Sequence, residues 1–93
     1  MLKIKKGFLL RKLGEEFMAV AIGDASKDFN GMIRLNGMGA FYWEELEKGS
    51  TEDELVRKTL EAYTGAEEDI VRSDVKEFLD TISIALEDDA ADN

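Results

Sequence analysis

The fold of this chain is decided by the stretch Leu35-Asn36-Gly37-Met38-Gly39-Ala40-Phe41-Tyr42-Trp43-Glu44-Glu45-Leu46-Glu47-Lys48-Gly49. Its first residue ends an expected strand, and Asn36-Gly37 is typical of a turn. Met38, Phe41, Tyr42 and Leu46 then recur at helical spacing, with Trp43 beside them. Gly49 supplies the left-handed residue that commonly ends a helix. The stretch therefore predicts a strand, a turn and a helix whose aromatic side chains pack in a core.

The composition indicates one small domain without the usual reactive side chains. The chain has 93 residues, 44% hydrophobic and 35% charged, and contains neither Cys nor His. Disulfides and thiolate metal sites are therefore excluded, and the common zinc, haem and triad chemistries lose their usual ligands and bases. We expect no catalytic residue, no metal and no cofactor. The acidic clusters at 52–54, 67–69 and 87–89 are interpreted as solvated helix starts rather than as cation sites.

The net charge of −9 is unevenly distributed along the chain. Residues 1–14 hold five basic residues and no acid, whereas residues 15–93 hold the other seven basic residues and all 21 acids. Such an acidic body repels phosphate backbones, so we expect no binding to nucleic acid. The basic end is interpreted as a solvated terminus, with a contact to an acidic partner as the alternative.

No stretch of the chain is suited to a membrane. No apolar run approaches the roughly 20 residues that span a bilayer. Arg11-Lys12 also interrupts the apolar start of the chain before it reaches the length of a signal-peptide core. We therefore expect a cytoplasmic protein without membrane contact.

The pattern along the chain predicts three strands followed by three helices. The strands are expected over Gly7–Leu13, Glu16–Ile22 and Phe29–Leu35, joined by a hairpin turn at Gly14-Glu15 and a polar turn over Gly23–Asp28. Short connections favour an antiparallel meander whose first and third strands are edges. The helices are expected over Met38–Leu46, from the cap Thr51 to Gly65, and from about Glu67 to about Leu86. The predicted class is α+β, winged-helix-like, with a three-stranded antiparallel meander followed by three helices.

One domain is expected over residues 1–86, because no linker or internal repeat divides the chain. The acidic segment 87–93 is expected to be a disordered tail.

Several residues match a known family in combination. They are Leu35-Asn36, Gly39-Ala40, Trp43, Leu46, Gly49, Thr51, Glu54-Leu55, Tyr63, Asp74-Val75 and Phe78-Leu79, with a spacing that extends from Gly7 to about Ile82. With this pattern the chain resembles the PqqD-like family, also called the RiPP recognition element. It departs from the family pattern at Lys48, where many relatives have aspartate. It also departs after Leu86, where acids replace a Gly-Leu-Leu-like or Gly-Trp-Leu-like end.

The resemblance implies a non-catalytic peptide-binding chaperone. Similar proteins bind the leader segment of a ribosomally synthesised precursor peptide and deliver it to a modifying enzyme, often a radical S-adenosylmethionine (SAM) enzyme. The resemblance also implies that the leader lies beside the third strand and over the last helix. An edge strand with free backbone groups and no proline is able to accept an added strand, which makes this arrangement physically reasonable.

The expected peptide-binding residues come from the third strand and the last helix. They are Phe29, Met32, Ile33, Arg34, Leu35, Arg72, Val75, Lys76 and Leu79. The basic residues among them would meet leader carboxylates, and Val75 and Leu79 would line an apolar pocket.

Five of these assignments have a structural alternative. Val75 and Leu79 also fit the buried stripe of a helix, and Arg34 fits a solvated charge on an edge strand. Arg72 and Lys76 also fit ion pairs with Asp69 and Asp80 on their own helix.

Three other functions are open on the sequence alone. An enzyme would need carboxylates buried in a pocket for general acid–base catalysis, whereas the acidic clusters of this chain are expected to be solvated. A DNA-binding winged-helix regulator would need a basic last helix, but acids outnumber Arg72 and Lys76 there. A structural module would use the open edge strand to pair with a second copy as a homodimer.

Overall fold

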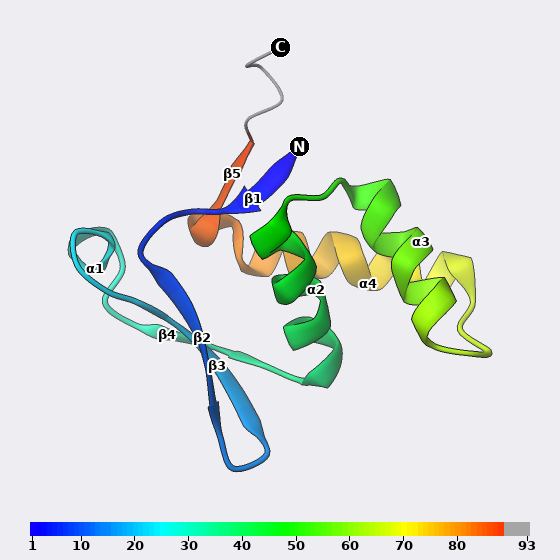
Figure 1. The fold of residues 1–93 in the computed structure, drawn as a ribbon, viewed down its shortest axis with the longest axis horizontal. Coiled ribbons are helices and arrows are strands. Elements are labelled where there is room, and N and C mark those ends of the chain that lie inside the picture. The colour runs from blue at the N-terminus through cyan, green and yellow to red at the C-terminus, as the bar shows by residue number, and fades with distance from the viewer. Residues whose placement is uncertain (89–93) are drawn as a thin grey trace.

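The computed structural model describes residues 1–88, which form two small sheets and a group of helices (Figure 1). The strands are β1 (Leu2–Ile4), β2 (Phe8–Leu13), β3 (Glu16–Ala21), β4 (Met32–Leu35) and β5 (Leu86–Asp88). The helices are α1 (Ala25–Asp28), α2 (Gly37–Lys48), α3 (Glu52–Ala62), α4 (Glu68–Thr81) and the short 3-10 helix η1 (Ser83–Ala85). The predicted α+β class, with a meander followed by helices, is confirmed.

The strands β2, β3 and β4 form the predicted antiparallel meander, with β2 and β4 at its edges. Leu13 pairs with Glu16 across a two-residue turn in which Gly14 has a φ of 62°. Glycine adopts this left-handed conformation without a steric penalty, so the hairpin closes tightly. In Figure 1 the β2–β3 hairpin extends away from the helices, and β4 leads to the start of α2.

The third strand is shorter than predicted, because it begins at Met32 rather than at Phe29. The ring of Phe29 packs instead against Phe8, with ring centroids 6.3 Å apart. The polar turn expected over Gly23–Asp28 contains the single-turn helix α1. The segment between β3 and β4 is thus tied to the sheet by an aromatic contact rather than by strand pairing.

The helix ends are set by capping residues, and Gly49 and Thr51 act as predicted. The Oδ1 atom of Asn36 accepts a hydrogen bond from the Gly39 N–H at 2.7 Å, and α2 ends where Gly49 takes a φ of 95°. The Thr51 hydroxyl accepts a hydrogen bond from the Glu54 N–H at 3.1 Å at the start of α3. These bonds satisfy backbone donors that have no partner within the helix.

The last helix ends earlier than predicted. α4 stops at Thr81, and η1 leads into β5, which pairs antiparallel with β1. We call this pair of strands the terminal clasp. The clasp includes Glu87 and Asp88, so the first two residues of the expected tail belong to a strand, and residues 89–93 lie outside the described residues. Leu2 faces Asp88 in the clasp and also exchanges backbone hydrogen bonds with Ser50, at 2.6 and 2.9 Å.

The core lies among α2, α3 and α4 and extends to Phe8 and Ala19 of the sheet. Tyr42, Trp43 and Leu46 of α2 are fully buried together with Leu55 of α3. Tyr42 also packs on Phe78 of α4, with ring centroids 5.2 Å apart. The interpretation of Tyr42 and Trp43 as packing residues is therefore confirmed. Burying a large apolar side chain contributes roughly 1.5–3 kcal/mol, so this contact fixes α2, and with it the end of β4, against α4.

Candidate functional site

The free edge of the meander runs along β4, and the hydrogen-bond alternation of β3 decides which β4 residues face it. The Ile22 N–H donates to the Gly7 carbonyl at 2.7 Å, on the side of β2. Backbone groups in a central antiparallel strand point alternately to its two neighbours. The backbone groups of positions 18, 20 and 22 therefore point toward β2, and those of positions 17, 19 and 21 point toward β4.

Two residues of β4 consequently direct their backbone groups away from the sheet. The β3–β4 register pairs positions 17 and 19 with Leu35 and Ile33, so these two bond to β3. Met32 and Arg34 lie between them in the alternation and point N–H and C=O outward. No other strand borders β4 among residues 1–88. The edge therefore offers two donors and two acceptors to a guest strand.

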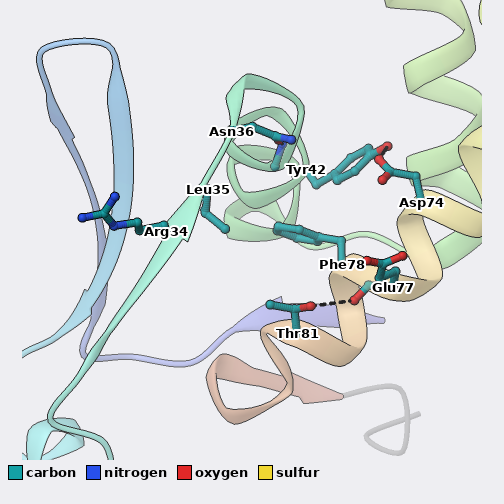
Figure 2. A pocket seen from close by; sticks show the side chains of 9 residues that line it. Arg34, Leu35, Asn36, Tyr42, Asp74, Glu77, Phe78 and Thr81 are labelled. Atoms are coloured by element: carbon teal, nitrogen blue, oxygen red, sulfur yellow. Dashed lines mark hydrogen bonds between the residues drawn. The ribbon is translucent and has the colours of Figure 1, made fainter.

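A groove separates this end of β4 from α4 (Figure 2). We call it the β4–α4 groove; its volume is about 240 Å³. In Figure 2, Leu35 and Phe78 point toward one another across it. The lining residues are Arg34, Leu35, Asn36, Gly39, Tyr42, Asp74, Glu77, Phe78 and Thr81. The groove thus combines an apolar contact with carboxylates on one wall.

The turn between β4 and α2 sets the width of the groove. An added Cβ on Gly39 would lie 3.2 Å from a ring carbon of Phe78 and 3.3 Å from the Cβ of Leu35. Ordinary van der Waals contacts of a Cβ begin at about 3.4 Å, so only glycine lets these side chains come this close to α2. The cap Asn36 places Gly39 in the first turn of α2, directly behind the groove.

A hydrogen bond joins α2 and α4 at the groove. The Tyr42 hydroxyl donates to Asp74 Oδ2 at 2.8 Å. Burial of the phenol, assisted by the bond to the Asp74 carboxylate, raises the pKa of Tyr42 above its usual value. Tyr42 therefore remains protonated near neutral pH and acts as a donor that positions Asp74, not as a base.

The residues expected on the third strand are distributed between the two faces of β4, except Phe29, which precedes the strand. Arg34 and Leu35 line the groove. Met32 is 56% exposed on the same face as Arg34, whereas Ile33 packs against the core, as the predicted alternation requires. Phe29 also packs against the core, ahead of β4. The structure thus brings Arg34 and Leu35 together in the groove and places Met32 beside it on the strand.

The two basic residues expected on the last helix lie away from the groove. Arg72 lies 2.8 Å from Asp53 of α3, and Lys76 lies 4.0 Å from Glu52 of α3. Residues two positions apart are separated by about 200° around an α-helix. Arg72 and Lys76 each lie two positions from Asp74, so they occupy the side of α4 opposite the groove. Both residues pair with acids of α3, and Arg72 also pairs with Glu68, one turn earlier on α4. The pairs are therefore not those with Asp69 or Asp80 that the sequence suggested.

The two apolar residues expected on the last helix belong to its buried side. Val75 is fully buried, and Leu79 packs against the core. The α4 residues that line the groove are Asp74, Glu77, Phe78 and Thr81. Sequence reasoning missed the polar members of this set because exposed acids three residues apart are typical of any solvated helix face.

The chemistry that the groove offers is that of binding. It presents backbone donors and acceptors, an apolar contact and carboxylates. Residues 1–88 contain no group of three His, Cys, Asp or Glu side chains placed to hold a metal ion. In the same part of the chain, no helix is long and apolar enough to cross a membrane.

Comparison with known families identifies the fold. A family model described as Coenzyme PQQ synthesis protein D (PqqD) matches residues 9–83. The chain belongs to the PqqD family. The matched residues of this PqqD-family chain run from β2 into η1 and include the whole β4–α4 groove. The resemblance seen in the sequence is therefore confirmed. No curated protein matches the chain.

Two solved structures share the fold of this PqqD-family chain. TbiB1 in complex with the TbiA(beta) leader peptide is 21% identical, with a TM-score of 0.74, and the match covers 95% of this chain and 98% of that one. Lasso peptide synthetase B1 complexed with the leader peptide is 11% identical, with a TM-score of 0.67, and the match covers 88% and 89% of the two chains. At these identities the likeness concerns the fold.

Proposed function

We propose that this chain binds the leader segment of a ribosomally synthesised precursor peptide by adding it as a strand to β4. The observation that carries the proposal is the outward backbone of Met32 and Arg34, which lies beside the β4–α4 groove. Membership of the PqqD family supports the same assignment. Both similar structures described above are complexes with a leader peptide, which agrees with it.

The contacts available in the groove set the scale of the affinity. Four backbone hydrogen bonds at the free edge would contribute about 1 kcal/mol each. An apolar leader side chain packed against Leu35 and Phe78 would add roughly 1.5–3 kcal/mol. A micromolar dissociation constant corresponds to about −8 kcal/mol, and ordering the peptide opposes binding. Contacts further along α4 are therefore needed for tight binding.

The role is one of presentation without catalysis. The groove holds carboxylates and a phenol kept protonated by its burial, with no nucleophile and base placed together among its lining residues. The bound leader would pass to a separate modifying enzyme, for which the family resemblance implies a radical SAM enzyme. We place this encounter in the cytoplasm, where the precursor peptide is synthesised.

A second copy of the chain is the competing occupant of the β4 edge, because a free edge accepts any compatible strand. Light scattering after size exclusion distinguishes the two cases. A monomer, or a dimer that the leader peptide dissociates, agrees with the proposal. A dimer that forms through β4 and resists an excess of leader peptide contradicts it.

Backbone amide shifts test the proposal directly. The probe is the leader segment of a precursor peptide encoded beside the gene, added to the isotopically labelled chain. We expect shifts at Met32 and Arg34 and along Asp74–Thr81, whereas residues of β2, the opposite edge, should stay unchanged. The absence of any shift, or shifts confined to β2, would overturn the proposed function. Isothermal titration with the same peptide supplies the dissociation constant.

A further inference from the structure

The hollow surface beside α4 continues beyond the β4–α4 groove. A second hollow of about 300 Å³ is lined by Met38, Tyr42, Gly65, Ala66, Glu67, Ile70, Val71 and Asp74. It shares Tyr42 and Asp74 with the groove, so the two hollows adjoin at this hydrogen-bonded pair. Ile70 is 64% exposed at its rim. A peptide added to β4 would therefore meet a path that follows α4 toward the α3–α4 turn.

The carboxylates along this path have no cationic partner. Asp74 and Glu77 line the groove, and Asp69, five residues before Asp74, lines a further hollow on α4 together with both of them. No Lys or Arg lies within ion-pair distance of any of the three in the described part of the chain. Asp74 has its hydrogen bond from Tyr42, a neutral donor, so its charge is not balanced.

The basic residues of the helical region are all engaged elsewhere. Residues 37–88 contain five Lys and Arg side chains. Every one pairs with an acid away from the groove: Lys48 and Lys58 with Glu45, Arg57 with Glu61, Arg72 with Asp53, and Lys76 with Glu52. The helices therefore neutralise their acids on one side and leave the groove wall negative.

Arg34, the cation that lines the groove, does not neutralise the carboxylates on the α4 wall. Arg34 forms an ion pair with Glu16 of β3 at 3.1 Å. Figure 2 shows its side chain turned toward the meander, away from Asp74 and Glu77 on α4. A guest that enters the groove thus encounters carboxylates on its helix side without a neighbouring positive charge.

We infer that the groove selects leader segments that carry a Lys or Arg beside an apolar residue. This inference rests on the proposed function. The strand edge and the contact between Leu35 and Phe78 provide the site, and the carboxylates decide what it accepts. The apolar leader residue would pack against Leu35 and Phe78, and the cation would lie against Asp74 and Glu77. Complementary charge discriminates between ligands, because an acidic leader residue would be repelled at the same place.

Selection from a random peptide library tests the inference and does not require the natural leader. Displayed dodecapeptides are selected on the wild-type chain and on the double variant Asp74→Asn/Glu77→Gln. The matched control is Glu15→Gln/Glu44→Gln, which removes two exposed charges outside every described hollow. Thermal unfolding followed by circular dichroism establishes that each variant is folded. Asparagine retains an oxygen that can accept the Tyr42 hydrogen bond, so folding of the double variant is expected.

The outcomes separate the inference from the proposed function. We expect wild-type peptides enriched in Lys or Arg at a fixed distance from an apolar residue, and binding at least tenfold weaker to the groove variant but within twofold for the control. Binding of the wild type should also weaken as salt rises, because salt screens the exposed charges. Peptides without basic enrichment, or equal binding to the groove variant, overturn the inference alone. If no peptide is enriched on the wild type, the proposed function fails and the inference fails with it.

Discussion

Replacing Arg34 with proline is expected to weaken leader binding while the meander stays intact. The Arg34 N–H points away from β3, so its loss leaves the β3–β4 ladder complete. Proline is tolerated on edge strands where the missing N–H faces outward. Arg34→Ala is the matched control, because it removes the same side chain and its ion pair with Glu16 but keeps the N–H.

The size of the effect follows from the contacts that differ between these two variants. Proline removes one backbone donor, worth about 1 kcal/mol net, and leaves the facing guest carbonyl without its partner, at a cost of about 1–3 kcal/mol. The expected loss is therefore about 1–3 kcal/mol relative to Arg34→Ala, or roughly 5–150-fold in the dissociation constant. The side chain itself contributes little, because Arg34 and Glu16 are 75% and 63% exposed and such pairs are worth at most about 1 kcal/mol.

Fluorescence anisotropy with a labelled leader peptide measures both variants against the wild type. Thermal unfolding by circular dichroism confirms that they fold. Ile33→Pro is expected to disrupt the sheet, because the Ile33 N–H faces β3, and it therefore checks the assigned alternation. If folded Arg34→Pro and Arg34→Ala bind within twofold of one another, the leader does not use the β4 backbone and the strand-addition argument is refuted.

Three further substitutions test the scaffold around the groove. Val75→Asp should leave the chain unfolded by circular dichroism, because it buries an unpaired charge in the core; a wild-type melting curve would place Val75 on the surface. Asn36→Ala should cost about 1 kcal/mol in urea unfolding through loss of the α2 cap, and Asn36→Asp should restore it; equal stability of all three chains would contradict this. Tyr42→Phe tests pH dependence. The raised pKa of Tyr42 means that the folded chain keeps a proton that the unfolded chain releases above pH 10.0. The contribution of the Tyr42 hydroxyl to the free energy of unfolding is therefore complete below that pH and falls above it. The stability difference between wild type and Tyr42→Phe should therefore shrink as the pH rises from about 10 toward about 12; a constant difference would argue against a buried phenol.

Local signals made the meander and the helix caps predictable from the sequence. The alternation around Ile33 and Arg34 and the turn at Gly14 depend on neighbouring residues only, so their pattern is visible without the fold. The same holds for Asn36 and Thr51, whose side chains bond to amides three residues later. The choice of Arg34 and Leu35 as peptide-binding residues rested in addition on the family resemblance, which implies that the leader lies beside the third strand.

The rotation of α4 was not predictable in the same way. Its apolar stripe, with Val75 and Phe78, indicates which side is buried but not which neighbour covers each polar flank. One flank meets α3 and receives Arg72, while the other meets β4 and presents Asp74. Only the packed arrangement of the helices distinguishes the two. The terminal clasp was missed because three-residue strands are too short to show a period.

The terminal clasp has a consequence for how such a module can be attached to other proteins. Residues that face one another in an antiparallel pair have Cα atoms about 4.5–5.5 Å apart, so Leu2 and Asp88 provide two attachment points at nearly the same place. A tether attached at Leu2 and one attached at Asp88 would therefore start from nearly the same point and hold the β4 edge at a similar distance from an enzyme. The whole module could equally be inserted into a surface loop of a larger chain, since closing that loop would require almost no stretching.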